Sequence, residues 1–330
     1  MLHYALRAAA AGAAVLIAVA GARAQTTLDV AVWHNEGSAW SHAYKWWEGE
    51  VEKRTAGRVK LKSYYSGSLV KNQEVFKAAR DGAIPMGVTS AGSISGQMPA
   101  LSYIEAEAGM PPDVAGHMKA VAALKPLLDE MFRKQRVKYI WMQPSFGGTV
   151  NCKDKHLKSV EDWKNLKIRT AGRWQAQQMQ ELGVKPTALD PAEQYIALQN
   201  KTVDCVLSNH EITLGLKLYE PAPKVTDLRL PVNVLLYLAS PRAWDRLAEN
   251  DRKAIEQAAA EAEKMAAEYL FALQGDIQGK IKAAGGDVYS LNDAERSALV
   301  AAMKPTFAKM DAESGADGAA VRKILEPFWR

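Results

Sequence analysis

The sequence predicts an α/β protein with two lobes, and three observations support this prediction. Between residues 27 and 88, short apolar segments alternate with helical patterns, an order typical of a parallel sheet with right-handed crossovers. The chain has 330 residues, which is enough for two lobes. A helical pattern also starts at Asn250 and ends at Gly285. Such a helix would be about 50 Å long, more than the diameter of one small domain, so we expect it to span both lobes.

Three strands and two helices are expected in the first part of the chain. Apolar segments predict strands over residues 28–32, 59–64 and 84–88. The helical patterns between them cover residues 38–54 and 72–79. We expect Asn72 to cap the second helix and Gly82 to end it.

The middle of the chain continues the alternation. A helix over residues 114–136 is expected to be kinked or broken near Pro126. Asp190 and Glu193 have the spacing of a capping box around Pro191, which predicts a helix start. Further strands are expected over residues 137–142, 166–169, 203–207 and 234–239.

These elements divide between the two expected lobes. We expect lobe I to comprise residues 25–147 and 234–273. Lobe II would then comprise residues 148–233 and 274–330. The pair Gly147-Gly148 is a plausible place for the chain to leave lobe I.

The first 24 residues have the pattern of a secretory signal peptide. A positively charged start ends at Arg7, residues 8–20 are small and apolar, and Ala22-Arg23-Ala24 is an A-x-A cleavage site. The apolar run is too short to span a bilayer, so we expect an exported protein without a membrane anchor. Cleavage near Ala24 would leave 306 residues (330 − 24).

Charge and motif content exclude several functions. The net charge is +5, and about +3 (5 − 2) once Arg7 and Arg23 are removed. No basic run with interleaved aromatic residues occurs, so a nucleic-acid partner is not expected. No CxxC or HExxH motif occurs, and no phosphate or dinucleotide loop, so we expect neither a metal nor a cofactor.

The chain contains two cysteines, Cys152 and Cys205. In an oxidising compartment they can form a disulfide, and the alternative is a pair of buried free thiols. We favour the disulfide, because both cysteines lie at the ends of expected strands in the same lobe.

Residues 162–208 contain the strongest functional signal. Arg169 lies at the carboxyl end of an expected strand, where α/β sheets place their ligands. Its planar guanidinium can make two parallel hydrogen bonds with a carboxylate. The alternative is a structural arginine at a strand end.

Several segments together resemble the extracytoplasmic solute receptors of TRAP (tripartite ATP-independent periplasmic) transporters, the DctP-like group. The resemblance covers nearly the whole mature chain. It rests on the order and spacing of pieces that are individually weak, namely residues 51–59 (Val-Glu-Lys-Arg-Thr-Ala-Gly-Arg-Val), 65–69, 78–86, 163–169 and 193–204.

The resemblance implies a two-lobed periplasmic binding protein fold, type II-like. Each lobe would be a mixed sheet flanked by helices, with a long C-terminal helix spanning both. It further implies a periplasmic receptor that closes around a small organic acid and delivers it to the small and large membrane permease subunits, without catalysis. Arg169 matches the family's carboxylate-binding arginine.

The chain also departs from the family pattern. Thr149 stands where many members have a second arginine, and Ser208 stands where they have an asparagine, with Asn209 next. A single cation favours a monocarboxylate, such as a 2-oxo, pyroglutamate-like or aromatic acid, over a C4-dicarboxylate.

Other candidate ligand-binding residues follow the expected strands. Trp33 and His34 follow the first strand, where the opposite wall should lie; the alternatives are a core tryptophan and an exposed histidine. Ser90 and Ser93 follow the third strand and could meet the polar end of a ligand.

Two further candidates belong to the second lobe. Trp174, five residues beyond Arg169, could cover the site, although an aromatic residue on a helix face is usually core. Asn209 could orient a ligand oxygen or cap the helix that starts at His210.

Three rival functions stay open at this stage. The chain could be a receptor for an ATP-driven importer, or for a sensor system, because these share the lobes and the cleft. A secreted hydrolase would need a nucleophile–base pair, and the six histidines show no usable spacing for one.

Overall fold

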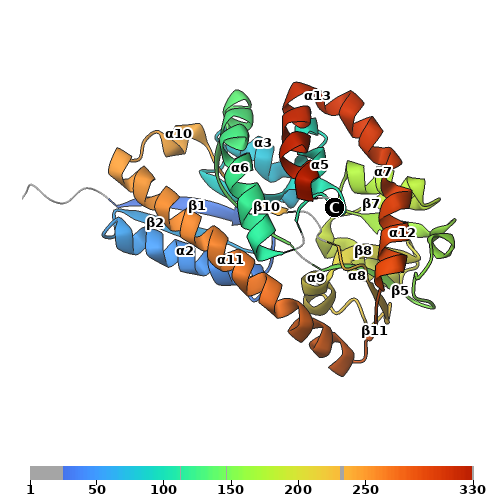
Figure 1. Cartoon of the computed structure of the whole chain (residues 1–330). Helices are drawn as coiled ribbons and strands as arrows, with labels where there is room; N and C mark the ends of the chain where they lie inside the picture. Colours follow the sequence, from blue (N-terminus) through green and yellow to red (C-terminus); the bar gives the residue numbers. More distant parts are fainter. Residues whose placement is uncertain (1–24, 112, 146, 231–233, 329–330) are drawn as a thin grey trace, which may run out of the picture.

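The computed structural model describes residues 25–111, 113–145, 147–230 and 234–328. The expected signal peptide, residues 1–24, lies outside the described residues. Two mixed sheets lie side by side, each flanked by helices, and a long helix runs along both (Figure 1).

The first sheet has five strands in the order β2-β1-β3-β10-β4. As expected, β1 pairs in parallel with β2 and β3, and β10 then pairs antiparallel with both β3 and β4. All five strands were predicted, with ends that differ by two residues or fewer. Their bounds are Thr26–Val32 (β1), Val59–Tyr64 (β2), Met86–Ser90 (β3), Lys138–Pro144 (β4) and Val234–Ala239 (β10).

The second sheet has six strands in the order β11-β9-β5-β8-β6-β7. No strand range was predicted for β5, β7, β9 or β11, although Cys152 was expected at the end of a strand. The bounds are Gly148–Cys152 (β5), Lys167–Thr170 (β6), Lys185–Ala188 (β7), Cys205–Asn209 (β8), Lys224–Asp227 (β9) and Asp287–Ser290 (β11).

The disulfide between Cys152 and Cys205 is present, as favoured from the sequence. The two residues lie directly opposite each other in the antiparallel β5–β8 pair, with their Cα atoms 4.4 Å apart. The bond therefore ties two neighbouring strands of the second sheet at one end.

The helices cover the outer faces of both sheets (Figure 1). Their bounds are Trp40–Arg54 (α2), Val75–Arg80 (α3), Ala91–Ile94 (α4), Ser102–Glu105 (α5), Val114–Lys134 (α6), Arg173–Glu181 (α7), Gln194–Gln199 (α8), His210–Gly215 (α9), Pro241–Trp244 (α10), Glu249–Ala283 (α11), Asp293–Met303 (α12) and Pro305–Leu325 (α13). Short 3₁₀ turns occupy Asn72–Glu74 (η1), Pro99–Leu101 (η2), Val160–Trp163 (η3), Pro191–Glu193 (η4) and Glu326–Phe328 (η5).

Of three local predictions, one is wrong, one is confirmed and one is narrowed. Helix α6 is not broken at Pro126, which lies inside its 21 residues, and a kink there stays a prediction. The Asn72 side chain does not cap a helix, because its amide bonds with residues of β3 and α4 instead. Asp190 and Glu193 do form a capping box, although the turn it opens is 3₁₀ and α8 follows it.

Helix α11 spans both sheets, as predicted. Its 35 residues correspond to a length of about 50 Å. The amino-terminal half packs Ile255, Ala259 and Ala266 into the core of the first sheet. The carboxy-terminal half packs Ile277 and Ile281 against β9 of the second sheet. One rigid element therefore connects the two halves of the molecule.

Helix α13 was expected in lobe II, but it packs elsewhere. It packs mainly against η2, α5 and α6, and only secondarily against α7 (Figure 1). Met310, Val321 and Leu325 join the apolar cluster on one face of the first sheet. Because these residues are buried there, the end of the chain packs over residues 99–134, and we assign α13 to lobe I. The other lobe boundaries remain a prediction.

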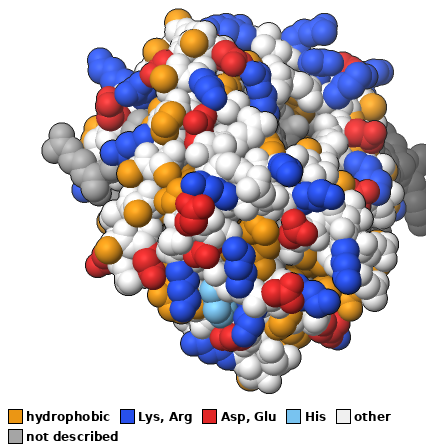
Figure 2. All heavy atoms as spheres, turned by 90° about the vertical axis from the view of Figure 1, so that its right-hand side faces the viewer, with side chains coloured by type: hydrophobic (Ala, Val, Ile, Leu, Met, Phe, Trp, Pro, Cys, Tyr) orange, Lys and Arg blue, Asp and Glu red, His pale blue; other side chains and the backbone are white. Residues whose placement is uncertain are grey.

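None of the helices in the described part of the chain has the length and apolar character needed to cross a membrane. On the face shown in Figure 2, basic and acidic side chains are interspersed. That face therefore lacks the continuous basic surface expected of a nucleic-acid binder.

Candidate functional site

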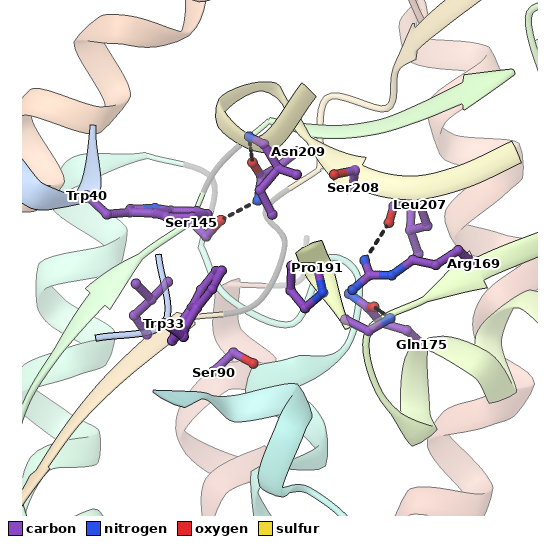
Figure 3. Close-up of a pocket in the computed structure, with 13 residues that line it drawn as sticks. Trp33, Trp40, Ser90, Ser145, Arg169, Gln175, Pro191, Leu207, Ser208 and Asn209 are labelled. Carbon is purple, nitrogen blue, oxygen red and sulfur yellow. Dashed lines mark hydrogen bonds between the residues drawn. The ribbon is translucent and has the colours of Figure 1, made fainter. Parts of the chain in front are cut away.

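A cavity lies between the two sheets, at the carboxyl ends of β1, β3, β6 and β8 (Figure 3). It encloses about 440 Å³ of empty space, including the solvent at its mouth. We call it the inner cavity. Its walls on the side of the first sheet include Trp33, Trp40, Ser90 and Leu235, and on the side of the second sheet Arg169, Gln175, Pro191, Leu207, Ser208 and Asn209.

Arg169 lies at the end of β6 and is 2% exposed. Its Nε and Nη2 atoms donate to the carbonyl oxygen of Leu189, at 3.0 and 2.9 Å. Its Nη1 atom donates to the carbonyl oxygen of Leu207 at 3.0 Å. These bonds hold the guanidinium plane in place. They use one N–H on each nitrogen, so each terminal nitrogen keeps one N–H without a partner among the described residues.

The positive charge of Arg169 is not paired with a neighbouring carboxylate in the described part of the chain. No carboxylate of the described residues lies within 4.0 Å of the guanidinium. Burial lowers the pKa of Arg169 to about 10, and the more distant Asp190 and Glu193 oppose this shift. The side chain is therefore still protonated at neutral pH. A buried cation of this kind is stabilised by an anionic ligand that replaces lost water.

Gln175 supports the arginine side of the cavity from the first turn of α7. Its Oε1 accepts from the backbone N–H of Ala171, and its Nε2 donates to Oε1 of Glu107 at 3.1 Å. Burial raises the pKa of Glu107 to about 8, and the nearby Glu105 adds to this shift. Gln175 thus separates the cavity from a buried carboxyl group.

Two polar residues at the end of β8 line the cavity. Asn209 caps α9, because its Oδ1 accepts from the N–H of Ile212 at 2.8 Å. This bond confirms the helix-capping alternative. The Nδ2 atom of Asn209 donates to Oγ of Ser145 at 3.1 Å. The hydroxyl of Ser208 is buried and has no hydrogen-bond partner in the described structure.

The arrangement is a narrow space between two walls, with one buried cation on its surface. Residues 30–314 match the family described as bacterial extracellular solute-binding protein, family 7 (DctP). The chain belongs to this family of solute-binding proteins. The match confirms the resemblance to TRAP receptors that the sequence segments indicated.

Individual relatives agree with the family match. The sialic acid-binding periplasmic protein SiaP of Vibrio cholerae is 26% identical over 253 residues, which cover 74% of this chain and 76% of SiaP. A TRAP periplasmic solute-binding protein of Desulfovibrio salexigens, solved with orotic acid, has a TM-score of 0.86 at 24% identity and covers 92% of this chain and 98% of its own. A Bordetella pertussis extracytoplasmic solute receptor binding pyroglutamic acid has a TM-score of 0.85 at 19% identity, with 91% and 99% covered. These structures confirm the two-lobed fold.

The family 7 receptor has a second, outer cavity next to the inner one. It encloses about 710 Å³, open solvent included, and shares Trp33, Trp40, Pro191 and Ile212 with the inner cavity. His34 lines this outer cavity and is 3% exposed, so it is not the exposed histidine of the alternative. Its Nδ1 lies 3.1 Å from Oγ of Ser38, and burial lowers the pKa of His34 to about 4. The imidazole is therefore neutral at pH 7.

The structure brings together five of the nine ligand-binding residues predicted from the sequence. Arg169, Trp33, Ser90, Ser208 and Asn209 all line the inner cavity. Whether they contact a ligand stays a prediction.

Three predicted residues lie outside both cavities of the receptor. Thr149 uses its hydroxyl inside the second sheet, where it bonds with Asn151 and Thr213. Trp174 is buried in the apolar cluster beside the first sheet, which is the core position considered as its alternative. Ser93 bonds to Ser90 at 2.7 Å and so can support a cavity residue without reaching the cavity.

Several cavity residues were not predicted from the sequence. Trp40 and Gln175 lie on helices, where their spacing indicates ordinary helix faces. Ser145 ends up beside Asn209 only after β4 and β8 are brought together by folding. Pro191 was recognised as a helix start, but nothing in its spacing indicates a cavity wall.

Proposed function

We propose that this protein is the periplasmic receptor of a TRAP transporter and captures a small organic acid through Arg169. It then delivers the acid to the small and large membrane permease subunits. Membership of family 7 supports the receptor role. The expected signal peptide and the disulfide, which suits an oxidising compartment, support the periplasmic location.

One observation carries the proposal. Arg169 is a buried cation without a counterion among the described residues, and each of its terminal nitrogens keeps one N–H for a ligand. A carboxylate would accept both N–H groups in parallel and would neutralise the charge. Each such bond contributes about 1.5–3 kcal/mol.

The charge of the cavity favours a ligand with one carboxylate. Arg169 is the single charged side chain among the described residues that line the inner cavity. A C4-dicarboxylate would leave its second carboxylate buried without a cation, which costs several kcal/mol. A monocarboxylate such as a 2-oxo, pyroglutamate-like or aromatic acid fits this charge.

We propose binding without turnover. The inner cavity has no histidine, cysteine or carboxylate among its described lining residues, so a general base next to a bound acid is missing there. A hydrolase therefore has less support than a receptor. The family match argues against a receptor that serves an ATP-driven importer. A receptor that serves a sensor system remains an alternative.

The test is a thermal-shift screen of purified mature protein against a panel of monocarboxylic, dicarboxylic and amino acids. We expect a monocarboxylate to raise Tm for the wild type and for Arg133→Ala, which alters an exposed surface arginine. Arg169→Ala should abolish that shift. A ligand that stabilises Arg169→Ala as much as the wild type would remove Arg169 from the site and overturn the proposal.

A further inference from the structure

We infer that a groove between α12 and α13 is a docking site for an acidic, amphipathic helix of a partner protein. We call it the helix groove. It shares no lining residue with the inner or the outer cavity. The inference does not depend on Arg169, so it goes beyond the proposed function and can fail without it.

The helix groove lies where α13 folds back on itself. The backbone at Gly315, inside α13, is not helical, and the second arm of α13 returns beside the first. Arg322 of the second arm forms an ion pair with Asp311 of the first. Residues of α12, of both arms of α13 and of η5 line the groove, and Figure 1 shows these elements on one side of the molecule. The groove is therefore bounded mainly by helices.

The size of the helix groove argues for a protein segment as its occupant. The groove encloses about 2100 Å³ of empty space, including the solvent at its mouth. Pockets for small molecules enclose about 300–1,000 Å³. The inner and outer cavities, at about 440 and 710 Å³ by the same measure, fall in that range. The helix groove is more than twice as large as the upper end of it.

The charge of the helix groove favours an acidic partner. Four basic and two acidic side chains line it, which gives a net charge of +2 (4 − 2). Both acidic side chains pair with Arg322. The other three basic side chains, those of Arg296, Lys304 and Lys323, have no carboxylate of the described residues within 4.0 Å. Carboxylates of a partner would complement these three charges.

Arg296 gives a second, independent indication of a missing acceptor. Its Nε atom is buried and has no hydrogen-bond partner among the described residues. A guanidinium can only donate hydrogen bonds, and a buried donor without an acceptor is unfavourable. A carboxylate in the groove could accept from Nε and from a terminal nitrogen of the same guanidinium in parallel.

Below these charges, the helix groove is apolar. Met110 and Leu230 are buried in its lining, and Phe307 and Phe328 are half-buried, whereas Lys304 is exposed. Burying apolar partner surface against these side chains is favourable. A flat lipid surface would meet the exposed cations and leave the apolar floor uncovered. The groove therefore suits a partner that has one apolar face flanked by carboxylates.

The walls of the helix groove favour a helix over an extended peptide. An extended peptide gains affinity by pairing with the edge of a sheet, and no strand contributes a described lining residue here. A helix satisfies its own backbone hydrogen bonds and binds grooves through one apolar face. The partner is therefore a helix with apolar residues at positions i, i+3, i+4 and i+7 and acidic residues beside them.

The test is fluorescence anisotropy with labelled synthetic peptides and the purified mature protein. The panel holds acidic peptides of about four helical turns, with leucine or phenylalanine on one face and glutamate beside it. Each has a counterpart with lysine in place of glutamate and a scrambled acidic counterpart. We expect at least one acidic helix to bind at least tenfold more tightly than both counterparts. Equal binding of the scrambled peptides, or binding of no acidic peptide, overturns the inference.

Two variants locate the binding. Lys304→Glu reverses an unpaired charge of the groove, and Ala301→Gln adds bulk at an exposed position that lines it. Each should weaken the best peptide at least tenfold. The matched controls are Lys282→Glu, an exposed lysine of α11, and Ala298→Gln, an exposed α12 position outside the groove, and neither should change the affinity.

The variants also separate the proposal from its rivals. Unchanged peptide affinity in both groove variants would mean that the peptide binds elsewhere, and would overturn the inference. Cosedimentation with phosphatidylglycerol vesicles tests a lipid surface as the occupant. Vesicle binding that Lys304→Glu abolishes, without binding of any peptide, would assign the groove to a membrane and would also overturn the inference.

Discussion

A hydrogen bond between Glu211 and Ala39 connects the two halves of the molecule beside the outer cavity. Oε1 of Glu211, in the first turn of α9, accepts from the backbone N–H of Ala39 at 2.6 Å. Ala39 directly precedes α2, so the carboxylate lies at the positive end of that helix. The two residues are 172 positions apart and belong to different halves of the molecule. The bond therefore exists only when the halves are closed against each other.

We expect Glu211→Ala to weaken ligand binding by destabilising the closed form, and not by removing a contact with the ligand. A hydrogen bond to a charged group contributes about 1.5–3 kcal/mol, and a loss of about 1.4 kcal/mol raises Kd tenfold. Titration calorimetry with the best acid of the panel would measure this change. Small-angle scattering should show a more open unliganded protein.

Glu268→Ala is the control for this prediction. Glu268 lies exposed on α11 and pairs with Lys264 on the same helix. An unchanged Kd in Glu211→Ala, with the control also unchanged, would show that the Glu211–Ala39 bond does not favour the closed form.

A second contact between the halves requires a glycine. A Cβ atom on Gly172 would lie 2.3 Å from Oε1 of Glu105 and 2.5 Å from the carbonyl oxygen of Gly92. The same Glu105 oxygen accepts from the N–H groups of Trp174 and Gln175 at the start of α7. We expect Gly172→Ala to force these segments apart and to cost about 1–3 kcal/mol of stability. Chemical denaturation would measure the loss.

Gly279→Ala is the matched control, because a Cβ at Gly279 meets no atom within 4 Å. Gly279 lies inside α11, near its carboxyl end, where this change should stabilise the protein by about 0.5–1 kcal/mol. If both variants were equally stable, the close approach at Gly172 would not be required.

Some strands could be predicted from the sequence and others could not, and this difference has a physical cause. Strand β10 is a continuous run of buried apolar residues, so its local pattern predicts it from the sequence. Strands β9 and β11 have four residues each, and β11 has no fully buried residue. They are strands because β9 pairs with β5 and β11 pairs with β9, which is a tertiary effect that a single segment does not reveal.

The residues of the candidate site also fall into those that could be predicted from the sequence and those that could not. Arg169 was named because it stands at an expected strand end and matches the family's carboxylate-binding arginine, and Ser208 because it stands where many family members have an asparagine. Thr149 was misplaced because the family position of a second arginine says nothing of the hydroxyl partners available here, Asn151 and Thr213. Trp40 was read as core because its helical spacing matches that of Tyr44 and Trp47.

The disulfide should stabilise the second sheet. The bond between Cys152 and Cys205 closes a loop with a sequence separation of 53 residues. Loops of this size restrict the unfolded chain and contribute about 2–4 kcal/mol. We therefore expect the double variant Cys152→Ala, Cys205→Ala to have a lower free energy of unfolding by that amount. Addition of a reductant to the wild type should have the same effect in urea denaturation, and should not affect the double variant. A wild type that is insensitive to reductant would contradict the prediction.

Two buried carboxyl groups should make stability depend on pH. Burial raises the pKa of Glu107 to about 8 and that of Glu105 to about 7, above the ordinary value of a glutamate. As pH rises from about 5 to 8, these groups lose protons first in the unfolded chain, which is thereby favoured. With respect to these groups, the free energy of unfolding should therefore be greatest below about pH 4.5, the ordinary pKa of a glutamate, and fall as pH rises toward 8.

Glu107→Gln tests this prediction, because the amide keeps an oxygen that can accept from Nε2 of Gln175 and carries no titratable proton. We expect this variant to be more stable than the wild type at pH 8 by about 1–3 kcal/mol and to show a flatter pH profile. Urea denaturation at intervals between pH 5 and pH 8 would measure both effects. Glu268→Gln, on the exposed face of α11, should leave the profile unchanged. A pH profile of Glu107→Gln parallel to that of the wild type would show that Glu107 is ionised in the folded protein.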